Sequence, residues 1–223
     1  MVTIVQCKVC LIFSVLVITC EAVIVQTNML LIMFDDLRPE LSVYDRNHMI
    51  TPNFDRFAQR SVIFDQAYAQ IAVCNPSRTS LLTGLRPDTT GCYNFQTPHS
   101  SHLILPTYLA RSGYNTAGIG KILHIETDDK NVWNFEAWEN GWYEYQSKES
   151  GIMNSSVMPD GSTPEEHFRD YQFTTKAIET LRKLVSTSTV DTVVPVTDAN
   201  EPAVQAAPKP FFLAVGFKLP HLS

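Results

Sequence analysis

The sequence of 223 residues predicts an α/β fold in which helices flank a mostly parallel sheet. Two observations lead to this prediction. Short apolar runs, typical of strands that are buried on both faces, alternate along the chain with segments of helical pattern. In addition, the apolar runs are followed by charged or polar residues. Ligands of open α/β sheets bind outside the carboxyl ends of the strands, so both observations indicate the same architecture.

Three segments are predicted to be strands because each is short, apolar and followed by polar residues: 29–34, 114–120 and 211–217. The residues that follow them are, in order, Asp35 and Asp36, then Lys121 and His124, then His221. The carboxyl ends of parallel strands lie at one edge of a sheet. These side chains are therefore expected to lie close together.

Four segments are predicted to be helices: 52–60, a segment that opens at Pro76, 105–112, and 163 to about 187. Proline is favoured at the first helical position, and Thr163-Pro164-Glu165-Glu166 is a capping box. Gly113 ends the third helix. The stretch 186–208 is rich in Ser, Thr, Val, Ala and Pro, which predicts an exposed loop or insertion.

Residues 1–22 are predicted to be a secretory signal peptide. Lys8 precedes the apolar run 9–19, which is short for a membrane span, and small or uncharged residues follow it. An uncleaved anchor and a first core strand are the alternatives. Signal removal would leave a mature domain of residues 23–223 with no stable membrane span.

Signal removal also changes the cysteine content, because Cys7, Cys10 and Cys20 would leave with the signal. Only Cys74 and Cys92 would remain, and a disulfide between them is the ordinary interpretation for a secreted chain. The formal net charge is −6 without a long basic run, which argues against a protein that coats nucleic acid.

Asp35 and Asp36 are adjacent carboxylates that repel each other unless a positive group joins them. A hard cation with oxygen ligands, calcium or magnesium, is the partner that their position at a strand end favours. An exposed acidic turn or a helix N-cap is the alternative.

Cys74 precedes the helix predicted at Pro76, where free backbone N–H groups favour a bound oxyanion. Arg78, in the first turn, could bind the same anion with two parallel hydrogen bonds. A catalytic thiolate and a packed structural cysteine are the other interpretations of Cys74.

Lys121 and His124 could face one ligand, the lysine holding negative charge and the histidine moving a proton near neutral pH. A surface lysine with a solvated histidine is the commoner arrangement for such a pair. A lone histidine after a strand, as at His221, is more often structural than catalytic.

Cys74-Asn75-Pro76-Ser77-Arg78, continued by Thr83-Gly84, resembles the signature of the type I sulfatases, a family of the alkaline-phosphatase-like superfamily. The Asp-Asp, Gly-Lys-x-x-His and Pro-His elements that belong to this family also occur in its order. Three further stretches resemble the iduronate-2-sulfatase branch: Phe34 to Pro39, Arg86 to Thr90 and Pro210 to His221. The resemblance extends from about Asn28 to His221 and implies the alkaline-phosphatase-like fold.

The resemblance further implies that the formylglycine-generating enzyme of the endoplasmic reticulum oxidises Cys74 to the aldehyde formylglycine. One calcium ion would be bound by Asp35, Asp36 and residue 74. The other catalytic residues would be Arg78 and Lys121, which hold charge, and His124 and His221, which move protons.

The implied substrates are sulfated glycosaminoglycans, with the 2-O-sulfate of iduronate in dermatan and heparan sulfate as the specific target. The implied locations are the lysosome and the extracellular space. Asn154-Ser155-Ser156 is a sequon for N-glycosylation.

Type I sulfatases are about twice as long as this chain, and their second set of metal ligands comes later in the sequence. The chain is therefore expected to be an incomplete, truncated N-terminal catalytic domain with weak or no activity and an exposed sheet edge. A secreted module without catalysis is the alternative function. A phosphate-ester hydrolase is the third, which the cysteine at position 74 argues against.

Overall fold

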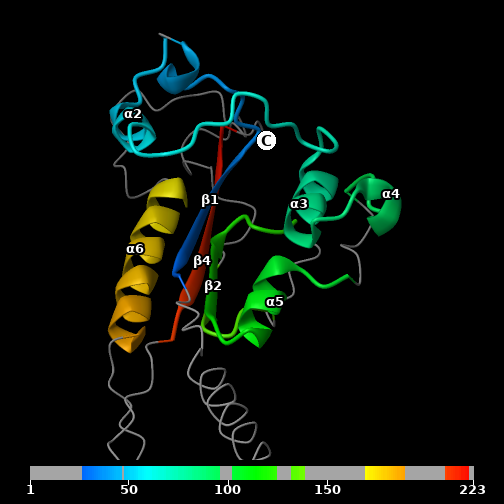
Figure 1. The fold of residues 1–223 in the computed structure, drawn as a ribbon, viewed down its shortest axis with the longest axis vertical. Helices are drawn as coiled ribbons and strands as arrows, with labels where there is room; N and C mark the ends of the chain where they lie inside the picture. Colours follow the sequence, from blue (N-terminus) through cyan, green and yellow to red (C-terminus); the bar gives the residue numbers. More distant parts are fainter. Residues whose placement is uncertain are drawn as a thin grey trace, which may run out of the picture.

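The computed structural model describes residues 27–46, 48–95, 102–124, 132–138, 169–188 and 209–220. These residues form a four-stranded parallel sheet with the order β1-β4-β2-β3. The strands are β1 (Met29–Asp35), β2 (Asn115–Gly120), β3 (Glu136–Trp138) and β4 (Phe211–Pro220). The last strand in the sequence, β4, lies between β1 and β2 (Figure 1), so it joins segments that are far apart in the sequence.

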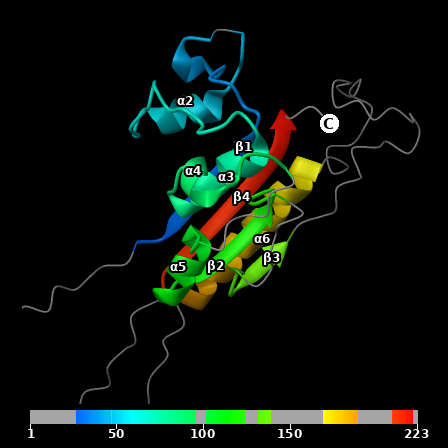
Figure 2. The same cartoon turned by 90° about the vertical axis from the view of Figure 1, so that its right-hand side faces the viewer.

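Helices cover both faces of the sheet, as Figure 2 shows from the side. The longest is α6 (Arg169–Ser188), which packs against β4 and β2 on one face. On the opposite face lie α5 (Leu105–Arg111) and α3 (Cys74–Thr83). The short elements η1 (Ser42–Tyr44), α2 (Pro52–Ala58) and α4 (Pro87–Thr90) complete the set of described elements.

Two apolar clusters, one on each face of the sheet, form the core of the described residues. The cluster on the α5 face includes Leu109, Leu123 and Phe212. The cluster on the α6 face includes Phe173 and Leu213, together with the other residues of β2, β4 and α6 that point to this side. Because successive residues of a strand face opposite sides, β4 contributes to both clusters, and all its residues from 211 to 216 are buried.

The α/β prediction is confirmed, and the predicted strands 29–34, 114–120 and 211–217 correspond to β1, β2 and β4. One boundary was wrong: α3 begins at Cys74 rather than at Pro76. Proline fits in the first turn because the N–H group that it lacks would have no partner within the helix. Thr51 precedes α2, and its hydroxyl forms a hydrogen bond with that of Ser42 at 2.7 Å instead of capping the helix.

Among the described residues, β1 forms one edge of the sheet and β3 forms the other. Leu30 and Ile32 lie on the α6 face, but α6 packs against β4 and β2, and half of each side chain is exposed. The expected exposed edge with apolar surface is therefore present in the described part of the chain. None of the described helices combines the length and hydropathy that a membrane crossing requires.

Some predictions fall on residues outside the described ranges. They are the signal peptide at residues 1–22, the sequon at Asn154, the capping box at Thr163 to Glu166, most of the loop 186–208, and His221. The loop prediction was wrong at its first residues, because α6 continues to Ser188.

The side chain of Glu136 connects the edge strand β3 to α6. Its carboxylate accepts a hydrogen bond from the Thr180 hydroxyl at 2.7 Å and pairs with the Lys176 ammonium at 2.7 Å. Burial alone would raise the pKa of this carboxyl, but the bonds from Lys176 and Thr180 outweigh burial and hold the pKa below its usual value. A lowered carboxyl pKa stabilises the fold above the unfolded-state pKa, and this stabilisation is lost as the pH falls.

We predict that Glu136→Gln lowers the free energy of unfolding by about 1 kcal/mol at pH 7. The difference from the parent chain should shrink as the pH falls below about 4.3, the ordinary glutamate value, because the parent then protonates Glu136 as well. Urea unfolding at pH 7 and pH 4 measures both effects. The control is Glu179→Gln, an exposed residue of α6 that pairs with Lys183, for which a smaller change is expected. An equal loss in both variants at pH 7 would contradict the prediction.

Candidate functional site

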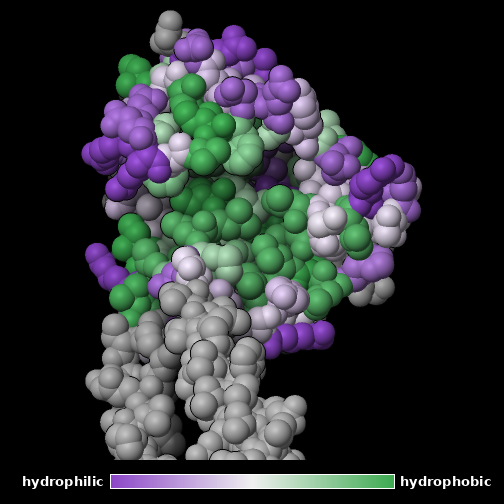
Figure 3. Space-filling model, in the orientation of Figure 1, coloured by the Kyte–Doolittle hydropathy of each residue, from purple (hydrophilic) through white to green (hydrophobic). Residues whose placement is uncertain are grey.

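The carboxyl ends of β1, β2 and β4 meet at one edge of the sheet, beside the first turn of α3 (Figure 1). Figure 3 shows a hollow in the surface between α3 and the segment that contains α2, above a broad apolar area. The site predicted from the sequence lies at this edge.

The two adjacent aspartates differ in their surroundings. Asp35 is the last residue of β1 and its side chain is 4% exposed, whereas Asp36 is exposed. Asp36 has a φ of 56°, in the left-handed region that aspartate enters more readily than most residues. This conformation turns the chain sharply after β1. The turn allows both carboxylates to approach Cys74.

Cys74 is the first residue of α3, and its backbone lies at the positive end of the helix dipole. Within the described part of the chain, no side chain caps this helix end. One ligand atom from each of Cys74, Asp35 and Asp36 can be chosen so that all three lie within 4.8 Å of one another. This is the one group of potential metal ligands of its kind among the described residues.

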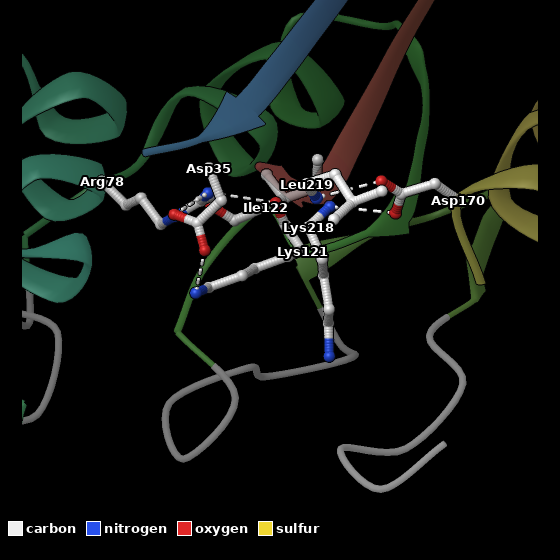
Figure 4. A network of polar contacts seen from close by, with 7 residues as sticks. All are labelled: Asp35, Arg78, Lys121, Ile122, Asp170, Lys218 and Leu219. Carbon is white, nitrogen blue, oxygen red and sulfur yellow. Dashed lines mark hydrogen bonds and ion pairs between the residues drawn. The ribbon is translucent and has the colours of Figure 1, made fainter. Parts of the chain in front are cut away.

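Asp35 is held by two buried cations (Figure 4). Arg78 donates from Nη2 to Asp35 Oδ1 at 3.0 Å, and Lys121 donates from Nζ to Asp35 Oδ2. The same guanidinium donates from Nη1 to the backbone oxygens of Lys121 at 2.6 Å and Ile122 at 3.1 Å. Arg78 therefore connects α3, the end of β1 and the segment after β2.

The charges of this cluster determine the protonation of Asp35. Burial would raise the pKa of its carboxyl, but the hydrogen bond from Lys121 and the charges of Arg78 and Lys121 outweigh that effect. The pKa therefore lies below the usual value for aspartate, and Asp35 is ionised at neutral and mildly acid pH. The sequence alone favoured a bound cation as the positive group that joins the two aspartates. In the structure, Arg78 and Lys121 already supply positive charge.

Close backbone packing fixes the position of Lys121. A Cβ atom on Gly216 would lie 1.8 Å from the Lys121 backbone oxygen, so only glycine allows β4 to approach the end of β2 this closely. Gly120, with a φ of 74°, would place a Cβ atom 2.2 Å from the Gly216 oxygen. The two glycines thus bring the lysine backbone against β4, from where its side chain reaches Asp35.

His124 is 5% exposed, and its ring centroid lies 5.3 Å from that of Phe95. The alternative of a surface lysine with a solvated histidine is therefore wrong for both Lys121 and His124, because both are buried. Cys74, Arg78 and Lys121 lie together around Asp35. His221 lies outside the described residues, one position after the end of β4.

Two of the interpretations of Cys74 do not agree with the structure. Cys74 and Cys92 both remain thiols, which excludes the disulfide. Burial raises the pKa of the Cys74 thiol, and the negative charges of Asp35 and Asp36 add to this effect while Lys121 opposes it. The interpretation of Cys74 as a catalytic thiolate, which needs a lowered thiol pKa, is therefore not supported.

The side chains of Asp35, Asp36 and Cys74 suit a hard cation only in part. The carboxylates of Asp35 and Asp36 are suitable oxygen ligands for calcium, whereas a thiol sulfur is not. A hydroxyl on an oxidised residue 74 would supply a third oxygen. Two negative charges from the aspartates and two positive charges from Arg78 and Lys121 sum to zero. A divalent cation would make the cluster positive, which suits an anionic ligand.

Asp170 at the start of α6 is a site residue that the sequence did not reveal. Its Oδ1 and Oδ2 atoms accept hydrogen bonds from the backbone N–H groups of Lys218 and Leu219, each at 3.0 Å (Figure 4). These amides lie 48 and 49 positions away in the sequence. An acidic residue in the first turn of a helix is common for dipole reasons alone, so no sequence signal distinguished this one.

Comparisons with known proteins agree with this arrangement. Iduronate 2-sulfatase from Homo sapiens is 33% identical over an alignment of 218 positions that covers 87% of this chain and 35% of the human protein. A sulfatase from Formosa agariphila is 31% identical over 87% of this chain and 39% of its own length. The chain thus spans little more than a third of the length of these relatives.

Among solved structures, BT4656 in complex with its substrate D-glucosamine-2-N,6-O-disulfate superposes with a TM-score of 0.62 at 27% identity. The superposition covers 88% of this chain and 35% of that one. It confirms the sulfatase-like, mostly parallel α/β architecture. The family model named Sulfatase matches residues 27–223, which include every described strand and helix. The chain therefore belongs to the sulfatase family.

Proposed function

We propose that this chain takes part in the hydrolysis of sulfate esters and that residue 74, oxidised to formylglycine, is the nucleophile. The observation on which this rests is the position of Cys74. It lies at the N-terminus of α3, within 4.8 Å of two carboxylates and beside the Lys121 ammonium. Family membership supports the reaction class.

The hydrated aldehyde supplies two hydroxyl groups on one carbon, one for attack at sulfur and one for release of sulfate by elimination. The side chains around residue 74 bind and orient the reacting groups. Lys121 approaches both Asp35 and the residue 74 side chain, so it can stabilise negative charge on the nucleophile. Arg78 holds Asp35 and the backbone that carries Lys121.

The two histidines are proposed to move protons. His124 is buried at the carboxyl end of β2 and is proposed to hydrogen-bond or deprotonate the second hydroxyl of residue 74. His221 follows β4 in the sequence and is proposed to protonate the leaving-group oxygen. Both assignments follow the resemblance of the sequence motifs to those of the family.

Asp35 and Asp36 are proposed to hold one calcium ion together with residue 74, and the ion would polarise a sulfate oxygen. Asp35 would then exchange part of its contact with Lys121 for the cation. Calcium prefers six to eight oxygen ligands, and these three residues supply fewer. A sulfatase-like module without catalysis is the alternative function.

The proposed substrates are sulfated glycosaminoglycans, and the 2-O-sulfate of iduronate is the proposed target because iduronate 2-sulfatases are among the relatives. Sulfatases named for other sugars also match, over a smaller part of this chain. The proposed route is the secretory pathway, where the formylglycine-generating enzyme acts, with the lysosome or the extracellular space as destination.

We predict that the chain secreted from a eukaryotic host carries formylglycine at position 74. Peptide mass spectrometry should find the peptide that contains residue 74 about 18 Da lighter than the thiol form. Cys92 in the same preparation is the internal control and should remain an unmodified thiol. Arg78→Ala, which changes the signature, should abolish the mass change. An unmodified Cys74 in the parent chain would contradict the nucleophile assignment, whatever the activity.

We also predict that calcium raises the thermal unfolding temperature of the converted chain and that Asp36→Asn removes this shift. Asp36 is exposed, so its substitution should change the metal-free stability little. Asp35→Asn should remove the shift as well, but should cost about 3–5 kcal/mol without metal because it leaves Arg78 and Lys121 buried without their counter-charge. Magnesium, sodium at matched ionic strength and Asp88→Asn, at an exposed acid of α4, are the controls.

A calcium shift that persists in Asp36→Asn would contradict the proposed metal site. Turnover of an iduronate 2-sulfate disaccharide, with a glucosamine 6-sulfate and a phosphate monoester in parallel, then separates the candidate functions. Converted and calcium-binding protein without turnover of any ester would favour the alternative of a module without catalysis.

A further inference from the structure

The end of β4 contains two residues that neither neighbouring strand of the described sheet pairs with. The register of β1 and β4 is regular up to Phe34 opposite Phe217, and then Asp35 lies opposite Pro220. Lys218 and Leu219 are therefore extra residues on β4, a bulge beside the site. On the other side, the pairing of β2 with β4 ends at Gly120 opposite Gly216.

Lys218 is buried, so its backbone N–H group needs an acceptor, whereas Leu219 is exposed. Asp170 supplies acceptors for both: one carboxylate oxygen accepts from Lys218 and the other from Leu219, each at 3.0 Å. A carboxylate that bonds two consecutive amides fixes the backbone of both residues. Hydrogen bonds to a charged acceptor are also stronger than those between neutral groups.

Figure 4 shows the consequence for the site. The end of β4 lies between Asp170 on one side and Asp35, with Arg78 and Lys121, on the other. The bulge moves Pro220 into register with Asp35, the buried carboxylate of the cluster. The position of the bulge therefore determines the register of Pro220 against Asp35.

We propose that Asp170 is a positioning residue of this site. By holding the bulge at Lys218 and Leu219, its carboxylate keeps Pro220 in register with Asp35, the buried carboxylate that binds Arg78 and Lys121. This deepens the proposed function and rests on it, because it concerns a residue assigned to that reaction. Asp170 itself acts through the backbone of β4 and is assigned no contact with substrate.

The first test is hydrogen exchange of the full chain, resolved by residue with NMR. Asp170→Ala should accelerate exchange of the Lys218 and Leu219 amides at least about tenfold, while the amides of Leu213 and Val215 in the centre of β4 stay unchanged. Asp170→Asn keeps one acceptor oxygen and should give an intermediate acceleration. The matched control is Thr174→Ala, which removes a hydroxyl bonded at 2.8 Å to the Asp170 backbone oxygen.

The second test reports on Asp35, which lies in register with Pro220. Its side-chain carboxyl carbon resonance should shift in Asp170→Ala, shift less in Asp170→Asn, and stay in place in Thr174→Ala. Unchanged exchange of both amides in Asp170→Ala would overturn the proposal. So would equal acceleration along all of β4, which indicates global destabilisation, or an unmoved Asp35 carboxyl resonance despite faster exchange at the bulge.

Both tests are independent of turnover, so they decide the role of Asp170 even where the proposed function fails. With an active preparation, Asp170→Ala should lower kcat at least about tenfold with a smaller change in KM, and Asp170→Asn should restore part of it. Failure of the calcium and formylglycine measurements, with the exchange result as expected, would reject the reaction and keep the positioning role.

Discussion

The buried carboxylate of Asp35 is the group on which the rest of the site depends. It ends β1, and its two oxygens bind cations from two other parts of the chain: Arg78 from α3 and Lys121 from the end of β2. Arg78 also binds the backbone that carries Lys121. Removing the Asp35 carboxylate would leave two buried cations without their counter-charge, so the positions of Arg78 and Lys121 depend on it.

This cluster also sets the chemical character of the site. Without a cation, the aspartates and the two basic residues balance, and the Cys74 thiol beside them is protonated because burial raises its pKa. A thiolate mechanism therefore finds little support, whereas oxidation of residue 74 together with a divalent cation would give a positive site with a hydroxyl nucleophile. The physical character of the cluster and the family membership thus support the same reaction class.

Local patterns allowed much of this structure to be predicted. The apolar runs at 29–34 and 211–217 form strands, and Asp35 and Lys121, which follow two of the predicted strands, lie in contact as expected because parallel strands end at one edge. The short strand β3 was missed. Its three residues, which include an exposed alanine and a partly buried glutamate, show no clear alternation of apolar and polar residues. Arg78 was expected to face a ligand beside Cys74, but it binds Asp35 and two backbone oxygens.

The interactions that were missed join residues far apart in sequence. Nothing local marks Asp170 as the acceptor for two amides of β4, or Gly216 as the glycine that admits the Lys121 backbone. Such contacts follow from the register of β4 between β1 and β2. Register depends on the whole sheet, and a pattern within one segment does not contain it.

A double-mutant cycle on Asp35→Asn and Lys121→Met tests the central role of Asp35 most directly, with the free energy of unfolding as the measured quantity. If the carboxylate and the ammonium form one buried unit, the two single losses should together exceed the loss in the double variant by about 1.5 kcal/mol or more. Losses that add to within about 0.5 kcal/mol would show that the two groups are independent, and would contradict the dependence of the site on the Asp35 carboxylate.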